Sequence, residues 1–129
     1  MLIAEVSVRT GLSVDTLRYY DQTGLVPHIA RQANGVRNFT EDNIHWIEFI
    51  KCMRAAGMPI GVLVEYVQLF KMGDATLETR RRLMEEQYEI MQGRLNVLKE
   101  TVDRLKNKLD SYDEDYQKVA EYLKPSEEK

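Results

Sequence analysis

Residues 16–26 read Thr16-Leu17-Arg18-Tyr19-Tyr20-Asp21-Gln22-Thr23-Gly24-Leu25-Val26, and this stretch decides the fold. It predicts a short helix that Ser13 can cap and that Gly24 can end in a left-handed conformation. A second short amphipathic helix, Ile3-Ala4-Glu5-Val6, lies upstream and is closed by Gly11. Two such helices joined by the tight turn Gly11-Leu12-Ser13 predict a helix-turn-helix, whose second helix enters the major groove of DNA.

The second helix carries side chains suited to DNA. Arg18 can reach a guanine edge or a phosphate, and Thr16 can reach a phosphate or a thymine methyl group. The hydroxyl groups of Tyr19 and Tyr20 can donate to phosphate oxygens. The short pattern is weakly specific by itself, because other small helical domains share it.

The following segments complete a small helical head. Residues 27–39 contain Pro27, Asn34 and Gly35 between short apolar stretches, which predicts two short strands and a turn, a wing. We expect a helix over about 41–54, capped by Thr40, with an apolar stripe on one side.

A further helix should begin at about Pro59. Gly57 ends the preceding helix, and Pro59 suits the first turn of a helix that runs to about Phe70. Gly73-Asp74 should break the chain again, with Asp74 able to cap a much longer helix.

The long helix carries apolar residues spaced alternately by four and three. Charged residues lie between them, and an apolar seam of this length predicts a coiled coil. At about 1.5 Å per residue the seam is roughly 42 Å long, too long to bury against the head, so a second chain should cover it. Packing within one chain is the less favoured alternative. The seam residues are Met84, Tyr88, Met91, Leu95, Leu98, Val102, Leu105, Leu109 and Tyr112.

Bulk properties point to a small cytoplasmic protein. The 129 residues suit one globular domain with an extension. We see no signal peptide and no apolar run of membrane-spanning length, and a single cysteine suits a reducing compartment. The first 72 residues carry no net charge, so a positive field must come from Arg18, Arg31 and Arg37 sharing one face with the acids elsewhere. Their seven basic and seven acidic residues are Arg9, Arg18, Arg31, Arg37, Lys51, Arg54 and Lys71, and Glu5, Asp15, Asp21, Glu41, Asp42, Glu48 and Glu65.

Several separated motifs agree in order and spacing with one family. The chain resembles the MerR family of bacterial transcription regulators, closely over residues 1–71 and in architecture beyond them. The matching motifs are Ile3-Ala4-Glu5-Val6, Gly11-Leu12-Ser13, Thr16-Leu17-Arg18-Tyr19-Tyr20, Gly24-Leu25-Val26, Gly35-Val36-Arg37, Asn38-Phe39-Thr40 and Arg54-Ala55-Ala56-Gly57-Met58.

The resemblance implies a mainly α fold, with a winged helix-turn-helix head and a long antiparallel coiled-coil dimerisation helix. It divides the chain into a DNA-binding domain (1–71), a hinge (72–75), a dimerisation helix (76–112) and a short C-terminal helix and tail (113–129). It also implies that a homodimer distorts an overlong promoter spacer so that RNA polymerase can engage. Two heads at a fixed separation predict an inverted-repeat operator.

Arg31, Asn34 and Arg37 are candidate DNA contacts in the wing. By residue type alone they would be solvated loop residues. The resemblance matches Arg37 to an arginine that meets the DNA backbone and Arg31 to a basic wing position. Val36 and Phe39 stand where tyrosines are common in the family, so two phosphate-reaching hydroxyls are expected to be missing.

Cys52 is the candidate sensor. From the residues alone it is either a small buried apolar side chain or a reactive thiol, since Lys51 and Arg54 flank it while the helix C-terminus opposes a thiolate. The stretch from Trp46 to Arg54 resembles the branch that answers aldehydes and nitrosative stress, where a lone cysteine at this position is the proposed sensor. A MerR-type regulator of a non-thiol signal remains the alternative.

Other functions have little support in the sequence. Cys52, His28 and His45 have no metal-ligand spacing, and we predict neither a metal nor a cofactor. Cys52 has no base partner, so we predict no enzyme. The rival from another class is a coiled-coil adaptor that binds protein rather than DNA. Arg18 and the wing arginines favour DNA, because an adaptor has no need of them.

Overall fold

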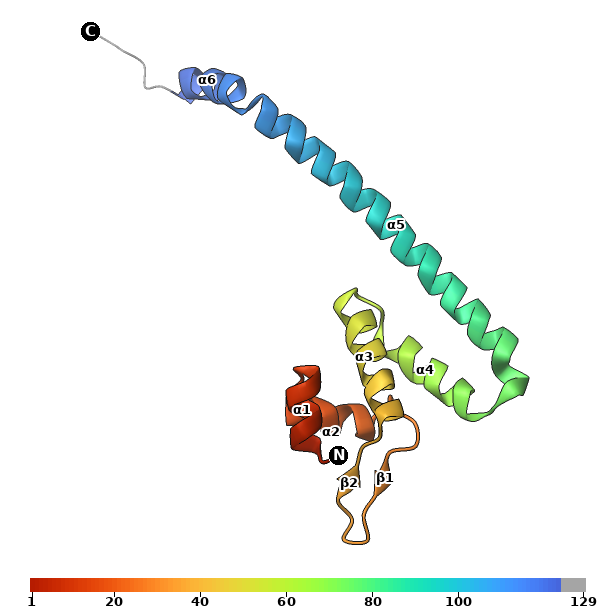
Figure 1. Cartoon of the computed structure of the whole chain (residues 1–129). Coiled ribbons are helices and arrows are strands. Elements are labelled where there is room, and N and C mark those ends of the chain that lie inside the picture. The colour runs from red at the N-terminus through yellow and green to blue at the C-terminus, as the bar shows by residue number, and fades with distance from the viewer. Residues whose placement is uncertain (124–129) are drawn as a thin grey trace. The chain divides into compact units, whose positions relative to one another are not determined.

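The computed structural model describes residues 1–123 and is mainly helical (Figure 1). The chain forms two compact units, one over Met1–Tyr88 and one from Glu89 onward. The mainly helical structure confirms the predicted fold class. In chain order the elements are α1 (Ile3–Thr10), α2 (Val14–Gln22), β1 (Ala30–Arg31), β2 (Arg37–Asn38), α3 (Glu41–Ala55), α4 (Ile60–Lys71), the 3-10 turn η1 (Asp74–Thr76), α5 (Leu77–Asp110) and α6 (Tyr112–Leu123).

The helix-turn-helix forms where its capping residues predict. Gly11 ends α1 at a φ of 74°. Ser13 then caps α2, because its Oγ accepts a hydrogen bond from the backbone N–H of Thr16 at 3.1 Å. Gly24 follows α2 with a φ of 76°, a conformation that costs a glycine little. Gly11 and Ser13 thus shape the turn between the two helices, and Gly24 lets the chain turn away after α2.

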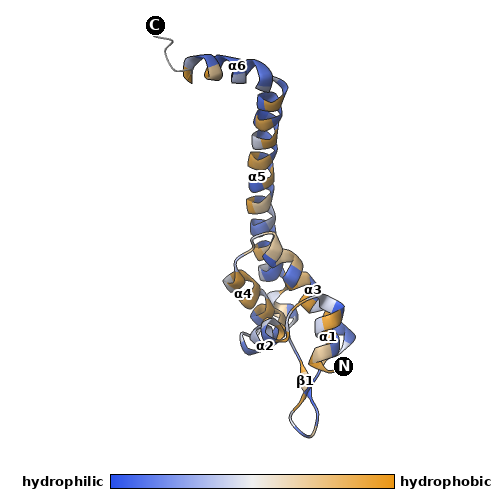
Figure 2. Ribbon diagram, turned by 90° about the vertical axis from the view of Figure 1, so that its left-hand side faces the viewer, coloured by the Kyte–Doolittle hydropathy of each residue, from blue (hydrophilic) through white to orange (hydrophobic). Residues whose placement is uncertain are grey.

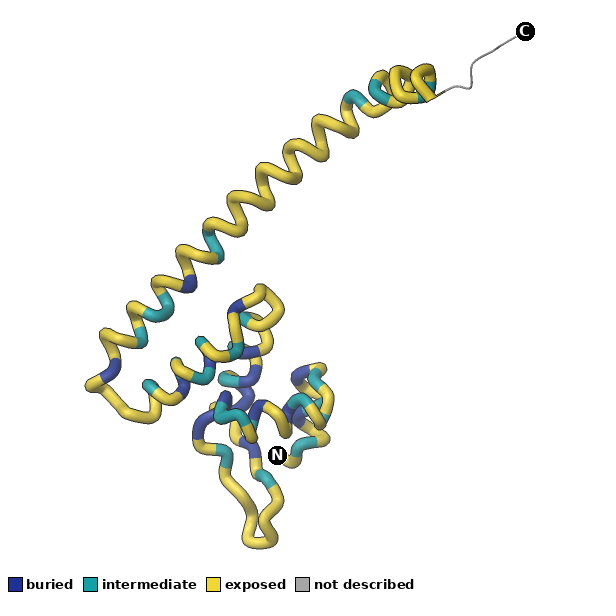
Figure 3. The backbone as a smooth tube through the Cα atoms, turned by 180° about the vertical axis from the view of Figure 1, so that it is seen from behind, coloured by how far each residue is buried: buried dark blue, intermediate teal, exposed yellow. Residues whose placement is uncertain are grey.

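The core lies among the first four helices of the head, where the buried segments gather in Figure 3. Removing this apolar surface from water supplies the main stabilisation of the head, at about 25 cal/mol per Å². The fully buried apolar side chains come from every helix of the head and from the chain after α2. They are Val6, Leu17, Leu25, Ile47, Ile50, Leu63 and Val67.

The wing is a two-stranded antiparallel ribbon, with Ala30 opposite Asn38 and Arg31 opposite Arg37. Thr40 and Asn43 then form a capping box that starts α3. The side-chain amide of Asn43 also donates to the carbonyl oxygen of Pro27 at 3.1 Å. One buried asparagine therefore ties the start of α3 to the chain that leads into the wing.

The connection between α4 and α5 differs from the expected cap. Asp74 does not cap the long helix; it begins η1, and α5 starts at Leu77. The hydroxyl of Thr76 is buried within 2.5 Å of the Leu69 carbonyl oxygen and 2.9 Å of that of Gly73. Arg80 donates to the same hydroxyl at 3.1 Å and lies over the Phe70 ring. We call residues 72–76 the elbow, and these bonds connect it to the end of α4 and to the first turn of α5.

From Leu95 on, the apolar seam of the long helix is exposed within residues 1–123, whereas Met84 and Met91 are half-buried. Figure 2 shows apolar residues recurring along α5, and Figure 3 shows most of it exposed. Leu98 keeps 59 % of its surface in water and Leu109 keeps 64 %. The helix ends at Asp110, so Tyr112, the last predicted seam residue, belongs to α6. No helix within residues 1–123 is long and apolar enough to cross a membrane.

Candidate DNA-binding surface

The recognition helix α2 presents Arg18 and Tyr19 to solvent. The Arg18 side chain is 51 % exposed and pairs with Asp15 one turn earlier, at 3.4 Å. Tyr19 is 48 % exposed. Thr16 is half-buried, with its hydroxyl 2.8 Å from that of Ser13 at the helix cap. Arg18 and Tyr19 are therefore accessible to a ligand, whereas Thr16 would have to share its hydroxyl with the cap.

Tyr20 lies in the core instead of beside these residues. It is 6 % exposed, and burial raises the pKa of its hydroxyl, while the Arg54 charge lowers it by a smaller amount. The same face of α2 carries Leu17, because residues three apart on a helix lie close together. Its burial assigns the ring of Tyr20 to packing, and a phosphate contact through its hydroxyl stays a prediction.

The wing arginines converge on one carboxylate at the end of α2. Arg37 Nε donates to Asp21 Oδ2 at 2.6 Å, and Arg31 Nη2 lies 3.5 Å from the same oxygen. Asp21 and Arg37 are only about a fifth exposed, at 21 % and 18 %. The sequence suggested that the acidic residues lie away from the three candidate cations. The structure contradicts this, because Asp21 lies between Arg31 and Arg37.

The tip of the wing is closed by its own hydrogen bonds. Asn34 Oδ1 accepts from the N–H of Val36 at 3.1 Å, and Gly35 has a φ of 84°. Arg31 donates from Nη1 to the carbonyl oxygen of Gly35 at 2.8 Å. Asn34 thus shapes the turn with its oxygen. The Arg31 side chain stabilises the turn through its hydrogen bond to Gly35 and is still 53 % exposed.

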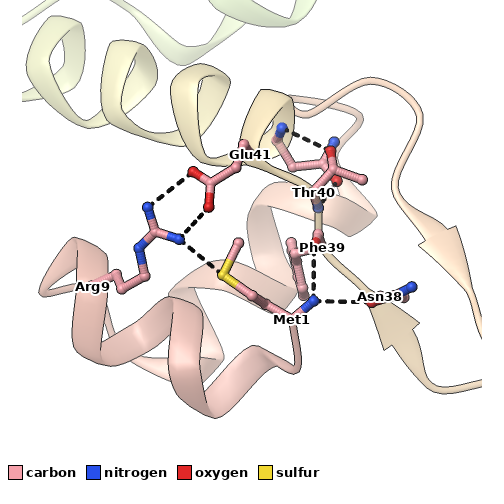
Figure 4. Close-up of polar contacts among 7 residues, drawn as sticks. Met1, Arg9, Asn38, Phe39, Thr40 and Glu41 are labelled. Atoms are coloured by element: carbon pink, nitrogen blue, oxygen red, sulfur yellow. Dashed lines mark hydrogen bonds and ion pairs between the residues drawn. The ribbon is translucent and has the colours of Figure 1, made fainter.

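A polar network joins the base of the wing to α1 and α3, as Figure 4 shows. Arg9 donates two hydrogen bonds to the carboxylate of Glu41, at 2.6 and 2.9 Å. Met1 donates from its amino group to Asn38 and to the carbonyl oxygen of Phe39, whose N–H donates back to Met1. The Arg9 hydrogen bond is the main reason why the pKa of Glu41 is lowered.

Different surroundings hold the side chains of Val36 and Phe39, the two wing residues that stand where tyrosines are common in the resembled family. Phe39 is 2 % exposed and packs in the core, whereas Val36 is 45 % exposed at the wing turn. A hydroxyl at position 39 would lie at a buried ring, so the aromatic side chain fits the core better without it. Val36 leaves an apolar side chain on the exposed part of the wing.

Cys52 lies on the surface near the end of α3. This contradicts the buried alternative raised by the sequence. The two neighbouring cations are both bonded to backbone carbonyls, Lys51 to Thr10 at 2.5 Å and Arg54 to Met58 at 2.9 Å. Within residues 1–123 no group of three or more histidine, cysteine or acidic side chains is placed to hold a metal.

A family model supplies the decisive comparison for this surface. Residues 1–69, which include both helices and the wing, match the model described as MerR HTH family regulatory protein. The chain belongs to the MerR family.

Two curated relatives of this MerR chain are themselves described as regulators. The HTH-type transcriptional regulator AdhR of Bacillus subtilis is 47 % identical over 87 residues, 67 % of this chain. That alignment spans 62 % of the relative, so just over a third of AdhR has no counterpart in it. An uncharacterised HTH-type transcriptional regulator from Haemophilus influenzae is 32 % identical over 109 residues, 84 % of this chain and 81 % of the relative.

Solved structures of MerR proteins extend the likeness beyond the head. A MerR family regulator from Listeria monocytogenes has a TM-score of 0.86 at 41 % identity, covering 95 % of this chain and 93 % of its own. HiNmlR, described as a MerR family regulator lacking the sensor domain and bound to promoter DNA, has a TM-score of 0.81 at 29 % identity. The alignment covers 92 % of this chain and 94 % of HiNmlR.

Sequence reasoning missed the residues that hold the MerR head in position. By residue type alone, Asp21 is only one of seven acids in the head. The signal for its role is its place at the end of the recognition helix, ahead of a wing with two arginines. Arg9 and Glu41 carried no comparable signal, because 31 residues separate them in the chain. Only the folded head brings their charges together.

Proposed function

We propose that this MerR-type DNA-binding regulator acts as a homodimer on an inverted-repeat promoter and changes the shape of the DNA when Cys52 reacts with an electrophile. The observation that carries the DNA-binding part is the pairing of an exposed Arg18 on a capped recognition helix with Arg31 and Arg37 on the wing. Asp21 links these two elements.

The proposed DNA contacts are of two kinds: some read base edges, and others bind the phosphates of the DNA backbone. Arg18 and Tyr19 lie on the helix that enters the major groove, and Arg18 is the side chain placed to read a base. Arg31 and Arg37 are assigned to phosphates. Asn34 keeps its amide nitrogen for the same purpose, because its oxygen is used in the turn.

The dimer is supported by the exposed seam of α5. Two heads fixed to one coiled coil present two recognition helices at a set separation, which suits an inverted repeat. Bending and untwisting the spacer costs about 1–6 kcal/mol and must be offset by added contacts. RNA polymerase is the further partner of this mechanism, and the cytoplasm is its compartment.

The signal is proposed to be an aldehyde or a related electrophile. The thiolate sulfur of Cys52 attacks the carbonyl carbon and forms an S–C bond. The π electrons of the C=O bond move to the oxygen, which takes up a proton equivalent to the one that the thiol released. The exposure of Cys52 allows this attack without unfolding of the head.

Exposure also changes how an adduct can act. The sequence suggested overpacking of a side chain in a packed place, but Cys52 is exposed in the single chain. An adduct there can extend into solvent and need not overpack the head. We therefore expect it to act against the second copy, so that the dimer and not the single chain responds.

Footprinting on the DNA upstream of the regulator's own gene tests the proposal. We expect protection of an inverted repeat with and without aldehyde, and hypersensitive central bases only with it. Loss of the whole footprint on adding aldehyde would show a simple repressor. Failure to bind this or any promoter fragment would favour the protein-binding adaptor.

A further inference from the structure

A cleft in the head lies between α3, α4 and the chain that enters the wing. Its volume is about 700 Å³, within the range of about 300–1,000 Å³ that is usual for small-molecule sites. In the described part of the chain, none of the candidate DNA contacts lines the cleft, and neither does Cys52. The cleft is therefore separate from both surfaces that the proposed function uses.

Four aromatic side chains form the apolar wall of the cleft. Trp46 and Phe49 come from α3, and Tyr66 and Phe70 come from α4. The Trp46 ring lies against the other three, with centroid distances of 4.9 Å to Phe70, 6.0 Å to Tyr66 and 6.4 Å to Phe49. The three pairs of ring planes are inclined by 50° to 87°, so these rings do not stack on one another.

The aromatic wall keeps surface that a ligand can cover. Trp46, Phe49 and Tyr66 are only half-buried, and Phe70 keeps 36 % of its surface in water. Covering apolar surface of this kind stabilises a complex, and inclined rings can receive a flat ligand edge-to-face or offset-stacked. The wall therefore favours a planar ring system over a branched aliphatic ligand.

The polar rim of the cleft carries a carboxylate. Asp42 lies in the first turn of α3, is exposed, and makes no ion pair with residues 1–123. The neighbouring Glu41 is instead paired with Arg9, at 2.6 Å. Histidine carries little charge above neutral pH, which applies to His28 and His45 at the rim. Among the lining residues that the structure describes, Asp42 is thus the only full charge, and it attracts cations.

The aromatic rings attract cations as well, because the face of such a ring carries negative charge and tryptophan attracts most strongly. The head already contains one contact of this type. The guanidinium carbon of Arg80 lies 5.3 Å from the centroid of the Phe70 ring. An aromatic cation in the cleft would gain from packing on the wall and from its charge. A neutral ring would gain only the packing, and Asp42 would repel an anion.

We propose that this cleft binds a small planar aromatic cation, such as a nitrogen heterocycle with a permanent positive charge. The aromatic wall binds the flat rings, and Asp42 and Trp46 favour the charge. The site depends on neither the electrophile nor the DNA of the proposed function, so each can be tested without the other.

Isothermal titration calorimetry of the full-length chain at pH 8 compares four probes. N-methylquinolinium has rings and a positive charge, quinoline has neutral rings, 1-naphthoate has rings and a negative charge, and tetramethylammonium has the charge alone. N-methylquinolinium should bind about tenfold more tightly than quinoline, and the other two should bind more weakly still. Quinoline or 1-naphthoate binding as tightly as N-methylquinolinium would overturn the proposal, and so would the absence of binding by all four.

A change at Asp42 separates the charge from the rings. Asp42→Asn should weaken N-methylquinolinium binding about fivefold and leave quinoline binding unchanged. Glu65→Gln removes an equal charge from an exposed position of α4 outside the cleft and should bind as the wild type does. Circular dichroism should show equal helix content in all three proteins. A folded Asp42→Asn variant with wild-type affinity for N-methylquinolinium would contradict the role of the carboxylate and overturn the proposal.

A change at Trp46 tests the wall. Trp46→Leu should weaken both N-methylquinolinium and quinoline about tenfold, whereas Trp46→Phe, which keeps a ring, should recover most of the quinoline affinity. Thermal unfolding checks that both variants fold. Equal affinities of folded Trp46→Leu and wild-type chains would overturn the proposed site.

The fluorescence of Trp46 reports where the probe binds, because it is the only tryptophan in the sequence. Its emission, corrected for probe absorbance, should change with the same midpoint as the calorimetric curve. A calorimetric curve without this change would place the probe elsewhere and overturn the proposal. Binding to a monomeric Leu98→Asp chain but not to the wild type would overturn it too, because a second copy would then fill the cleft.

Discussion

Arg37 donates from Nε to Oδ2 of Asp21 at 2.6 Å, so the base of the wing is tied to the last turn of the recognition helix. The bond uses the nitrogen nearest the chain and leaves the two terminal nitrogens of the guanidinium for a phosphate. In the proposed function, Asp21 thereby orients a cation toward DNA and at the same time offsets part of its positive charge. The wing should move with α2 when the head docks.

We expect Asp21→Asn to raise affinity for random DNA and to reduce the ratio of specific to non-specific binding. One negative charge would leave the DNA face, and the wing would lose its link to α2. Fluorescence anisotropy with operator and scrambled duplexes, over a range of salt, measures both quantities. Glu48→Gln removes an equal exposed charge from α3 and serves as the control. An Asp21→Asn variant that keeps wild-type discrimination would show that the link is dispensable.

Arg18→Ala should abolish specific operator binding, with a loss of about 1–3 kcal/mol at the base it reads. Arg37→Ala should weaken all sequences alike and reduce the salt slope by about one unit or less, since Asp21 already offsets part of its charge. Arg81→Ala on α5 is the control for lost charge. If Arg37→Ala altered which operator variants are preferred, the backbone assignment would be wrong.

Leu98→Asp should separate the dimer and remove operator binding with it, because a charge would enter a layer that excludes water. Asn96→Asp adds the same charge outside the seam and should stay dimeric. Analytical ultracentrifugation reads the mass, and a mobility shift reads DNA binding. A Leu98→Asp chain that remains dimeric would show that other residues hold the copies together.

Cys52→Ser should keep dimerisation and operator binding but lose the response to aldehydes and nitrosating agents. Because the thiol is exposed, Leu98→Asp monomers should still be alkylated at Cys52 at a similar rate. Intact-protein mass spectrometry measures modification, and a promoter-reporter strain measures induction. Normal induction in the Cys52→Ser strain would return this cysteine to a structural role.

The head should lose stability in acid partly through Glu41. Its pKa is lowered in the folded chain, chiefly by the hydrogen bond from Arg9, so the ionised form favours folding. That contribution is fully present above the ordinary carboxyl pKa, about 4.3, and is lost as the pH falls through the lower folded value. Glu41→Gln should unfold more easily at neutral pH and show a smaller further loss in acid. Urea titrations at several pH values test this, and equal losses in both proteins would contradict it.

Local signals predicted most of the fold. Ser13, Gly24, Thr40 and Pro59 mark helix boundaries through chemistry that acts within a few residues, and the structure places helix ends at or beside all four. The four-and-three spacing of apolar residues predicted the long helix for the same reason. The end of the long helix was predicted less well. The apolar spacing continues past Asp110 to Tyr112, but the helix ends at Asp110.

Features that depend on distant residues were not predictable in this way. Whether a tyrosine packs inward depends on which face of α2 meets the core, and the neighbouring Tyr19 and Tyr20 divide between solvent and interior. The exposure of Cys52 likewise depends on where α3 ends relative to the rest of the head. The Asp21 link needs the wing to fold back onto α2, and sequence spacing alone does not indicate that.

The hydrogen bonds of the elbow also fix how α4 is rotated about the axis of the first turns of α5. Thr76, Gly73 and Arg80 hold the end of α4 against the start of α5 without a slack segment between them. Adding or removing one residue there would turn the head by about 100° around the axis of α5, since each helical residue advances by that angle. In the proposed dimer both recognition helices would then miss their half-sites even though every contacting side chain was intact. We expect natural variants of this regulator to tolerate substitutions at the elbow far better than a change in its length.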